Sequence, residues 1–105
     1  MLKELFEIAV GVLAVAAVAA VVVAIVTWDE IQSWFQSHKN EIDNTDRVAR
    51  TVVDALANGS FKVKKGVFNK QTNAFQVEDT VECKSIDAEL KRRHAGKRIV
   101  DHYIG

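Results

Sequence analysis

Nineteen consecutive residues, 8–26, carry neither a charged nor a polar side chain, and this run limits what the chain can fold into. As an α-helix it would be roughly 28 Å long, close to the hydrocarbon thickness of a bilayer. About half of the run is β-branched, but in lipid the helix still forms because the backbone must satisfy its own hydrogen bonds. The 79 residues that follow are too few and too charged to enclose it. We therefore expect a transmembrane helix or a helix in the core of an oligomer.

Small residues recur at helical spacing within this run. Ala16, Ala20 and Ala24 are four residues apart and would share one helix face. Small side chains at that spacing let two membrane helices approach closely, which predicts helix packing and self-association through this face. The run contains seven alanines, so chance spacing is the alternative explanation.

The next segment, residues 28–58, predicts an amphipathic helix. Its first apolar side chains follow helical spacing, and tryptophan at the end of an apolar span is typical of a membrane interface. A seam with steps of three and four residues continues to about residue 56. The segment 43–46 resembles a helix cap, so a break near Asn44 is possible. The residues expected at the interface are Trp28, Ile31, Trp34 and Phe35.

From residue 60 the apolar period changes from about 3.6 to 2, which indicates strands. Residues 59–105 predict a strand, a second strand, a short helix ending near Gly96, and a last strand. The predicted fold class is α+β: a transmembrane or core helix, a long amphipathic helix, and a small α+β tail. The predicted domains are an anchor at 1–27, an amphipathic juxtamembrane segment at 28–58 and a basic domain at 59–105.

Charge divides the chain although the net charge is zero. Residues 1–58 carry four basic and eight acidic side chains, and residues 59–105 carry ten basic and six acidic ones. Five cations fall within eight residues, which indicates a site for an anionic partner such as an acidic protein surface or lipid phosphates. A solvated helix end is the simpler alternative, and nucleic acid is the weaker one, because no aromatic residue interleaves the cluster. The five are Lys91, Arg92, Arg93, Lys97 and Arg98.

No pattern in the chain predicts catalysis, a metal or a cofactor. The three histidines lack the i, i+4 spacing of helical metal ligands, and no glycine-rich phosphate loop, CxxC or HExxH motif occurs. Asp101 and His102 are adjacent in an expected strand, so their side chains should point to opposite faces. Cys83 is the only cysteine, and its alternating apolar context predicts a buried thiol.

These patterns predict a single-pass membrane protein whose C-terminal domain lies in the cytoplasm. Its function would be that of a non-enzymatic structural or accessory subunit, acting through homo-oligomer assembly or partner binding. A first alternative is a filament or capsid subunit, because the plan of an apolar helix followed by a small β-rich tail resembles pilin-like subunits. A second is a membrane-tethered protein whose basic tail binds anionic lipid or nucleic acid.

Overall fold

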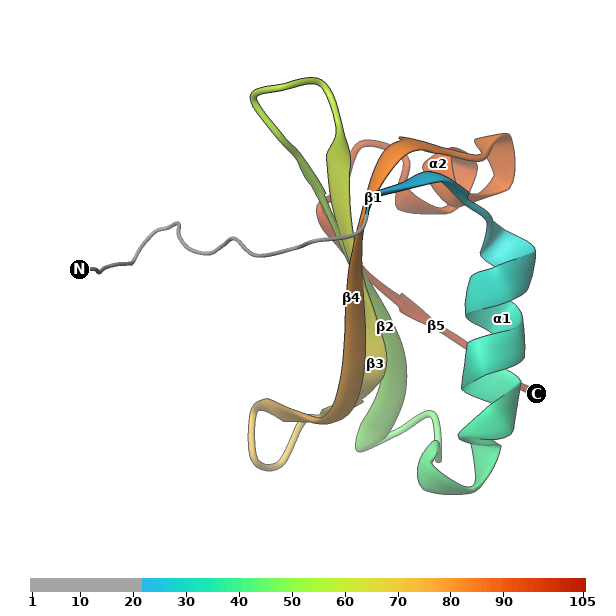
Figure 1. The fold of residues 1–105 in the computed structure, drawn as a ribbon. Coiled ribbons are helices and arrows are strands. Elements are labelled where there is room, and N and C mark those ends of the chain that lie inside the picture. Colours follow the sequence, from blue (N-terminus) through green and yellow to red (C-terminus); the bar gives the residue numbers. More distant parts are fainter. Residues whose placement is uncertain (1–21) are drawn as a thin grey trace.

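A five-stranded mixed sheet organises the computed structural model, which describes residues 22–105 (Figure 1). The spatial order of the strands is β1-β4-β3-β2-β5. The long strands β2, β3 and β4 form an antiparallel meander, β1 runs parallel to β4, and β5 runs antiparallel to β2. The elements are β1 (Val22–Val26), α1 (Trp28–Ser37), a 3-10 helix (Lys39–Glu41), β2 (Arg47–Ala55), β3 (Phe61–Asn69), β4 (Ala74–Ile86), α2 (Ala88–His94) and β5 (Ile99–His102).

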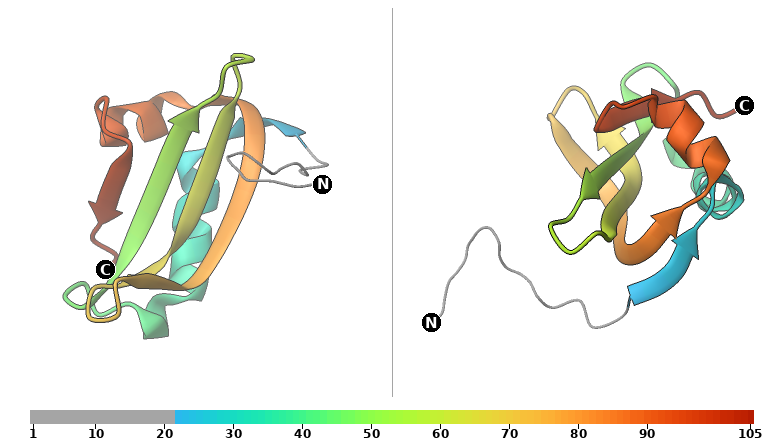
Figure 2. Two further views of the ribbon diagram at one scale, coloured as in Figure 1. Left: turned by 90° about the vertical axis from the view of Figure 1, so that its left-hand side faces the viewer. Right: turned by 90° about the horizontal axis from the view of Figure 1, so that it is seen from above.

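Both helices lie on the same side of the sheet, which we call the inner face (Figures 1 and 2). Helix α1 begins with a capping box, in which Thr27 accepts from the Glu30 N–H and the Glu30 carboxylate accepts from the Thr27 N–H. Its apolar side packs into the core, where Ile31 and Phe35 are fully buried. The sheet contributes alternate residues to this core, because successive side chains of a strand point to opposite faces. These residues include Ala49, Val63, Val67 and Cys83.

Several charged side chains of the sheet pair with a charge on the neighbouring strand. On the outer face Lys64 pairs with Glu78 at 3.1 Å. On the inner face Lys65 pairs with Asp79 at 2.7 Å, which provides a partner for the one acid that the alternation of β4 places inward. Opposite charges on adjacent strands stabilise this pairing of β3 with β4.

The predicted apolar helix is wrong where the structure describes it. Residues 22–26, the end of the predicted span, form strand β1 and pair with residues 82–86 of β4. Ala24 therefore lies in a strand, whereas Ala16 and Ala20 lie outside the described residues. The physical reason is that this segment is rich in valine and isoleucine, which suit a pleated surface, and a complementary edge of β4 is available.

The predicted long amphipathic helix over residues 28–58 is also wrong. The helix stops at Ser37, and residues 47–55 form β2. The reversal between them is held by Asp43, whose Oδ1 accepts from the backbone N–H groups of Thr45, Asp46 and Arg47. Asn44 adopts a left-handed conformation with φ of 61°. The polar cluster therefore forms a turn into a strand instead of a cap that starts a helix.

The prediction of a single-pass membrane protein is corrected as well. Within residues 22–105, no helix combines the length and the apolar composition needed to cross a bilayer. The residues expected at a membrane interface lie instead on α1, where Trp28, Ile31 and Phe35 are buried in the core and Trp34 is half-buried beside it. The remaining part of the predicted span, residues 8–21, lies outside the described residues.

The last 47 residues contain two strands, a helix and a strand in the order that their pattern predicts. They are not a separate tail, however. Strand β2 lies between β3 and β5 and bonds to both, so residues on either side of position 59 share one sheet and one core. A short β5 needs β2 as its neighbour because a four-residue strand cannot form alone.

Replacing the central aromatic of α1 should test whether this core holds the fold together. We expect Phe35→Ala to lower the free energy of unfolding by about 3–5 kcal/mol, because it removes a fully buried ring and leaves a cavity. Tyr103→Ala is the control, since this side chain is 81% exposed, and it should change stability by less than about 0.5 kcal/mol. Urea unfolding of both variants measures the difference, and similar losses would contradict the described core.

Candidate functional site

The candidate site lies where α2 leaves the sheet and returns to β5. Asp87 caps α2 by accepting from the Leu90 N–H at 3.0 Å, and the same carboxylate accepts from the Trp28 N–H at the start of α1. At the other end of α2, Ala95 and Gly96 both have positive φ, 49° and 82°, which reverses the chain. These two left-handed residues direct the chain from α2 into β5.

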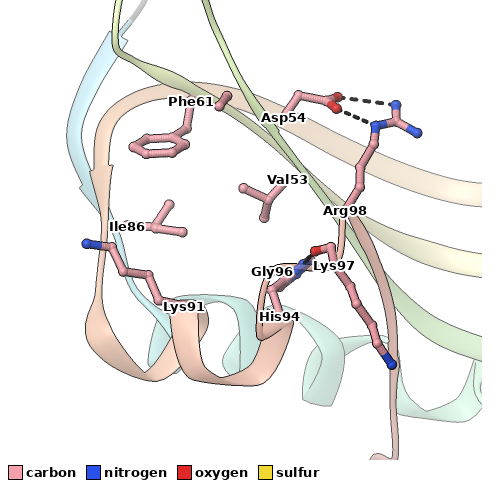
Figure 3. Close-up of a pocket in the computed structure, with 10 residues that line it drawn as sticks. Val53, Asp54, Phe61, Ile86, Lys91, His94, Gly96, Lys97 and Arg98 are labelled. Atoms are coloured by element: carbon pink, nitrogen blue, oxygen red, sulfur yellow. Dashed lines mark hydrogen bonds and ion pairs between the residues drawn. The ribbon is translucent and has the colours of Figure 1, made fainter.

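A pocket of about 420 Å³ opens at this corner (Figure 3). Its apolar floor consists of Val53, Phe61 and Ile86, which come from three different strands and gather in one space. Its rim is polar and mainly cationic. The rim residues are Asp54, Lys91, Lys97 and Arg98, and the buried His94 also lines the pocket. We call the whole site the basic pocket.

The structure separates the five basic residues that the sequence predicts for an anionic partner. Arg92 and Arg93 both pair with Glu89, and Arg98 pairs with Asp54 through two hydrogen bonds. Arg93 also places its guanidinium 3.9 Å above the Trp28 ring, a stacking contact that holds the side chain in place.

The other two predicted cations line the pocket. Lys91 and Lys97 are exposed and make no ion pair with any residue of the described range 22–105. Their side chains extend in different directions on either side of the apolar floor (Figure 3). Two positive charges are therefore available at this site, whereas three of the five predicted cations already have acidic partners.

A buried polar chain supports the pocket from inside. Thr51 is fully buried, and its Oγ1 lies 2.7 Å from the Nε2 atoms of both His94 and His102. The Nδ1 of His94 lies 2.7 Å from the Lys97 carbonyl oxygen, so it must carry the proton and donate. In the neutral ring Nε2 then accepts from the Thr51 hydroxyl, and the Nε2–H of His102 donates to Thr51. The chain fixes both tautomers and connects β5 and β2 to the loop that carries Lys97.

The sequence did not reveal this chain. Thr51 lay on a predicted helix, and its partners are 43 and 51 residues away. The usable signal was the alternation of Ala49, Thr51 and Val53 once residues 47–55 are read as a strand. The prediction that Asp101 and His102 point to opposite faces is confirmed, because Asp101 pairs with Arg50 on the outer face while His102 is buried inside.

Other reactive groups do not gather at the pocket. Cys83 is fully buried, as its sequence context predicts, and burial raises the pKa of its thiol, which keeps it protonated near neutral pH. Within residues 22–105, no group of three or more His, Cys, Asp or Glu side chains is placed to hold a metal ion. The chemistry that the pocket offers is therefore an apolar surface with nearby positive charge.

The structure is thus a five-stranded mixed sheet with both helices on one face and a basic pocket at one corner. No protein-family model matches the chain, and the comparisons with curated proteins and with solved structures found no significant similarity.

Removing the central hydroxyl should show that the buried polar chain stabilises the fold. We expect Thr51→Val to lower the free energy of unfolding by about 1–3 kcal/mol, because the His102 N–H and the His94 Nε2 lose their partner inside the protein. Thr80→Val, an exposed position on the outer face of β4, should change it by less than about 0.5 kcal/mol. Chemical unfolding measures both, and equal effects would contradict the assignment.

The same chain predicts how stability depends on pH. Burial, reinforced by the charge of Arg93 and by the neighbouring His94 ring, lowers the pKa of His102 from 6.5 to about 4, while Asp101 acts in the opposite direction. Between these two values the unfolded chain binds more protons than the folded one. Stability should therefore be highest above pH 6.5 and fall as the pH is lowered towards 4.

Urea titrations at a series of pH values measure this dependence. His102→Gln removes the titrating ring but keeps an N–H donor, so its stability should fall less between pH 6.5 and 4. Hydrogen bonds from the Arg47 and Thr45 backbone lower the pKa of Asp43 to about 2, so its contribution to stability is lost only below about pH 3.8. The pH range in which Asp43 acts therefore lies below that of His102. An unchanged dependence in His102→Gln would exclude His102 as its source.

Proposed function

We propose that this protein is a non-enzymatic binding module that holds an acidic segment of a partner protein in the basic pocket. The observation that carries the proposal is the apolar floor of Val53, Phe61 and Ile86, flanked by two lysines without ion-pair partners in the described residues. Groups of this kind recognise a ligand that presents an apolar side chain next to negative charge.

The positions of the two lysines favour an extended partner segment over a small compact anion. Lys91 and Lys97 extend on different sides of the floor and do not converge on one point (Figure 3). An apolar side chain seated between Phe61 and Ile86 would therefore have an acidic residue on each side. Burying that side chain supplies about 1.5–3 kcal/mol, whereas exposed ion pairs at the rim contribute about 0–1 kcal/mol each and mainly set specificity.

Charge also favours protein over nucleic acid as the partner. Arg92 and Arg93 share Glu89, and Arg98 pairs with Asp54, so Lys91 and Lys97 are the two cations of the pocket lining that have no ion-pair partner among residues 22–105. A phosphate backbone is bound by a longer array of available cations, and stacking of bases needs exposed aromatic rings. Phe61, the aromatic residue of the floor, is half-buried.

Reversing the two lysine charges should reverse the preference of the pocket. Selection of a displayed random-peptide library on the immobilised full chain should enrich peptides with an apolar residue between acidic ones. With Lys91→Glu/Lys97→Glu, the enriched flanking residues should become basic. A selected acidic peptide should bind this variant at least about tenfold more weakly, a loss of about 1.4 kcal/mol or more, measured by fluorescence anisotropy.

Lys39→Glu/Lys70→Glu is the matched control. It makes the same change in net charge at two exposed lysines outside the pocket, and the selected motif and affinity should remain those of the wild type. If no motif is enriched, or if the motif does not respond to Lys91 and Lys97, the proposed function is wrong.

A further inference from the structure

Strand β1 forms one edge of the sheet, with β4 as its only neighbour among the described residues (Figure 2). It is entirely apolar, with the sequence VVAIV, and the side chains of Val22 and Ile25 are 43% and 45% exposed. Natural edge strands are usually protected by a charge, a proline, a bulge or short length. The opposite edge follows this rule, since β5 has only four residues and carries Asp101. The β1 edge is one residue longer than β5 and has neither a charge nor a proline.

Two hydrogen bonds show which backbone groups of β1 face this open edge. The Ala24 carbonyl oxygen accepts from the Ser85 hydroxyl at 3.2 Å, and the Val26 carbonyl oxygen accepts from the Asp87 N–H at 3.1 Å. Both carbonyl groups therefore point towards the end of β4. Neighbouring residues of a strand direct their backbone groups to opposite sides, so Val23 and Ile25 present their N–H and C=O groups to the open edge.

This arrangement is complementary to itself, and we propose that the β1 edge binds the β1 edge of a second copy of this chain. The two strands would run antiparallel about a two-fold axis at Ala24. Val23 would then face the partner subunit's Ile25, and Ile25 would face the partner subunit's Val23. Both are hydrogen-bonded pairs of an antiparallel ladder, because each of these residues directs its N–H and C=O outward. The contact is isologous, so it closes as a dimer.

A second observation favours the same occupant. A groove of about 270 Å³ lies beside β1 on the inner face. Its lining is mainly apolar and includes Val23, Ile25, Ile31 and Val81, with the charged side chains of Glu30 and Lys65 also contributing. In the antiparallel pairing, the partner subunit's Ile25 lies beside Val23 on this same face. One added strand therefore satisfies the open backbone groups and extends apolar contact along the edge of the groove. The paired strands carry no charge, so nothing in them repels a second copy.

The proposal does not rest on the basic pocket, because none of the residues that line the pocket belongs to β1. A disulfide at the symmetry axis tests it in the full chain. Facing residues of a non-hydrogen-bonded antiparallel pair have Cα atoms about 4.5 Å apart, within the range that a disulfide requires. Under mild oxidation, Ala24→Cys should form a covalent dimer, moving the protein from 11.7 kDa to twice that mass on non-reducing gels. The native Cys83 is fully buried, so the wild type should remain uncrosslinked.

Ala74→Cys is the matched control, since Ala74 is also an exposed strand alanine but lies at the start of β4. It should remain monomeric under the same oxidation. Ile25→Pro, added to Ala24→Cys, removes an N–H that faces the open edge and leaves the bonds of Ala24 and Val26 to the end of β4 in place. This second variant should lose the covalent dimer while retaining the unfolding midpoint of Ala24→Cys.

Two results would overturn the proposal. If Ala24→Cys crosslinks no faster than Ala74→Cys, a second copy does not occupy the edge, whether it is open or covered by another part of the chain. If crosslinking persists in a folded Ile25→Pro variant, the contact is not the proposed backbone pairing. Should Ile25→Pro fail to fold, the comparison of Ala24→Cys with Ala74→Cys still decides the question.

Discussion

Burial of the apolar side of α1 against the inner face of the sheet is the interaction on which the rest of the structure depends. Ile31 and Phe35 are fully buried there, and burying one such side chain contributes about 1.5–3 kcal/mol. The position of the helix is fixed at its start, because the Asp87 carboxylate accepts from the Trp28 N–H and also caps α2. One side chain thus holds the first turns of both helices next to each other on the inner face.

The buried chain of His94, Thr51 and His102 connects this core to the surface. A polar group inside a protein is costly unless it is hydrogen-bonded, and here each of the three side chains has a partner. The last link is the Lys97 carbonyl group, in the loop that carries one of the two available lysines of the basic pocket. The hydrogen bond from His94 therefore anchors this loop to the buried side chains of the core.

The basic pocket and the β1 edge are compatible in one molecule. The pocket is lined by residues of β2, β3, β4, α2 and the following loop, whereas the open edge belongs to β1 alone. A second copy that adds its strand at β1 thus leaves the lining of the pocket unchanged. Such a dimer would present two pockets, and two linked binding sites increase the apparent affinity for a partner that offers two acidic segments.

Some features follow from the sequence alone because they depend on local periodicity or on composition. The predicted alternation is present in β3 and in β4 from Val77 onward, and it places Cys83 and Asp79 on the inner face, where the structure has them. A register shift instead pairs Phe75 with Phe68, away from the face that the alternation predicts. The opposite directions of Asp101 and His102 follow from the geometry of a strand. The cationic character of residues 91–98 is also a property of the sequence, and it marks the rim of the pocket.

Only the tertiary structure decided between helix and strand for residues 22–26 and 47–55. The apolar residues of both segments fit the helical period as well as the strand period. The neighbouring strand therefore decides the structure: β4 pairs with the first segment, and β3 and β5 pair with the second. The same holds for the site. Thr51, His94 and His102 meet across 43 and 51 residues of chain, and Val53, Phe61 and Ile86 meet from three strands. Contacts of that separation are set by strand order and register, which local sequence patterns do not encode.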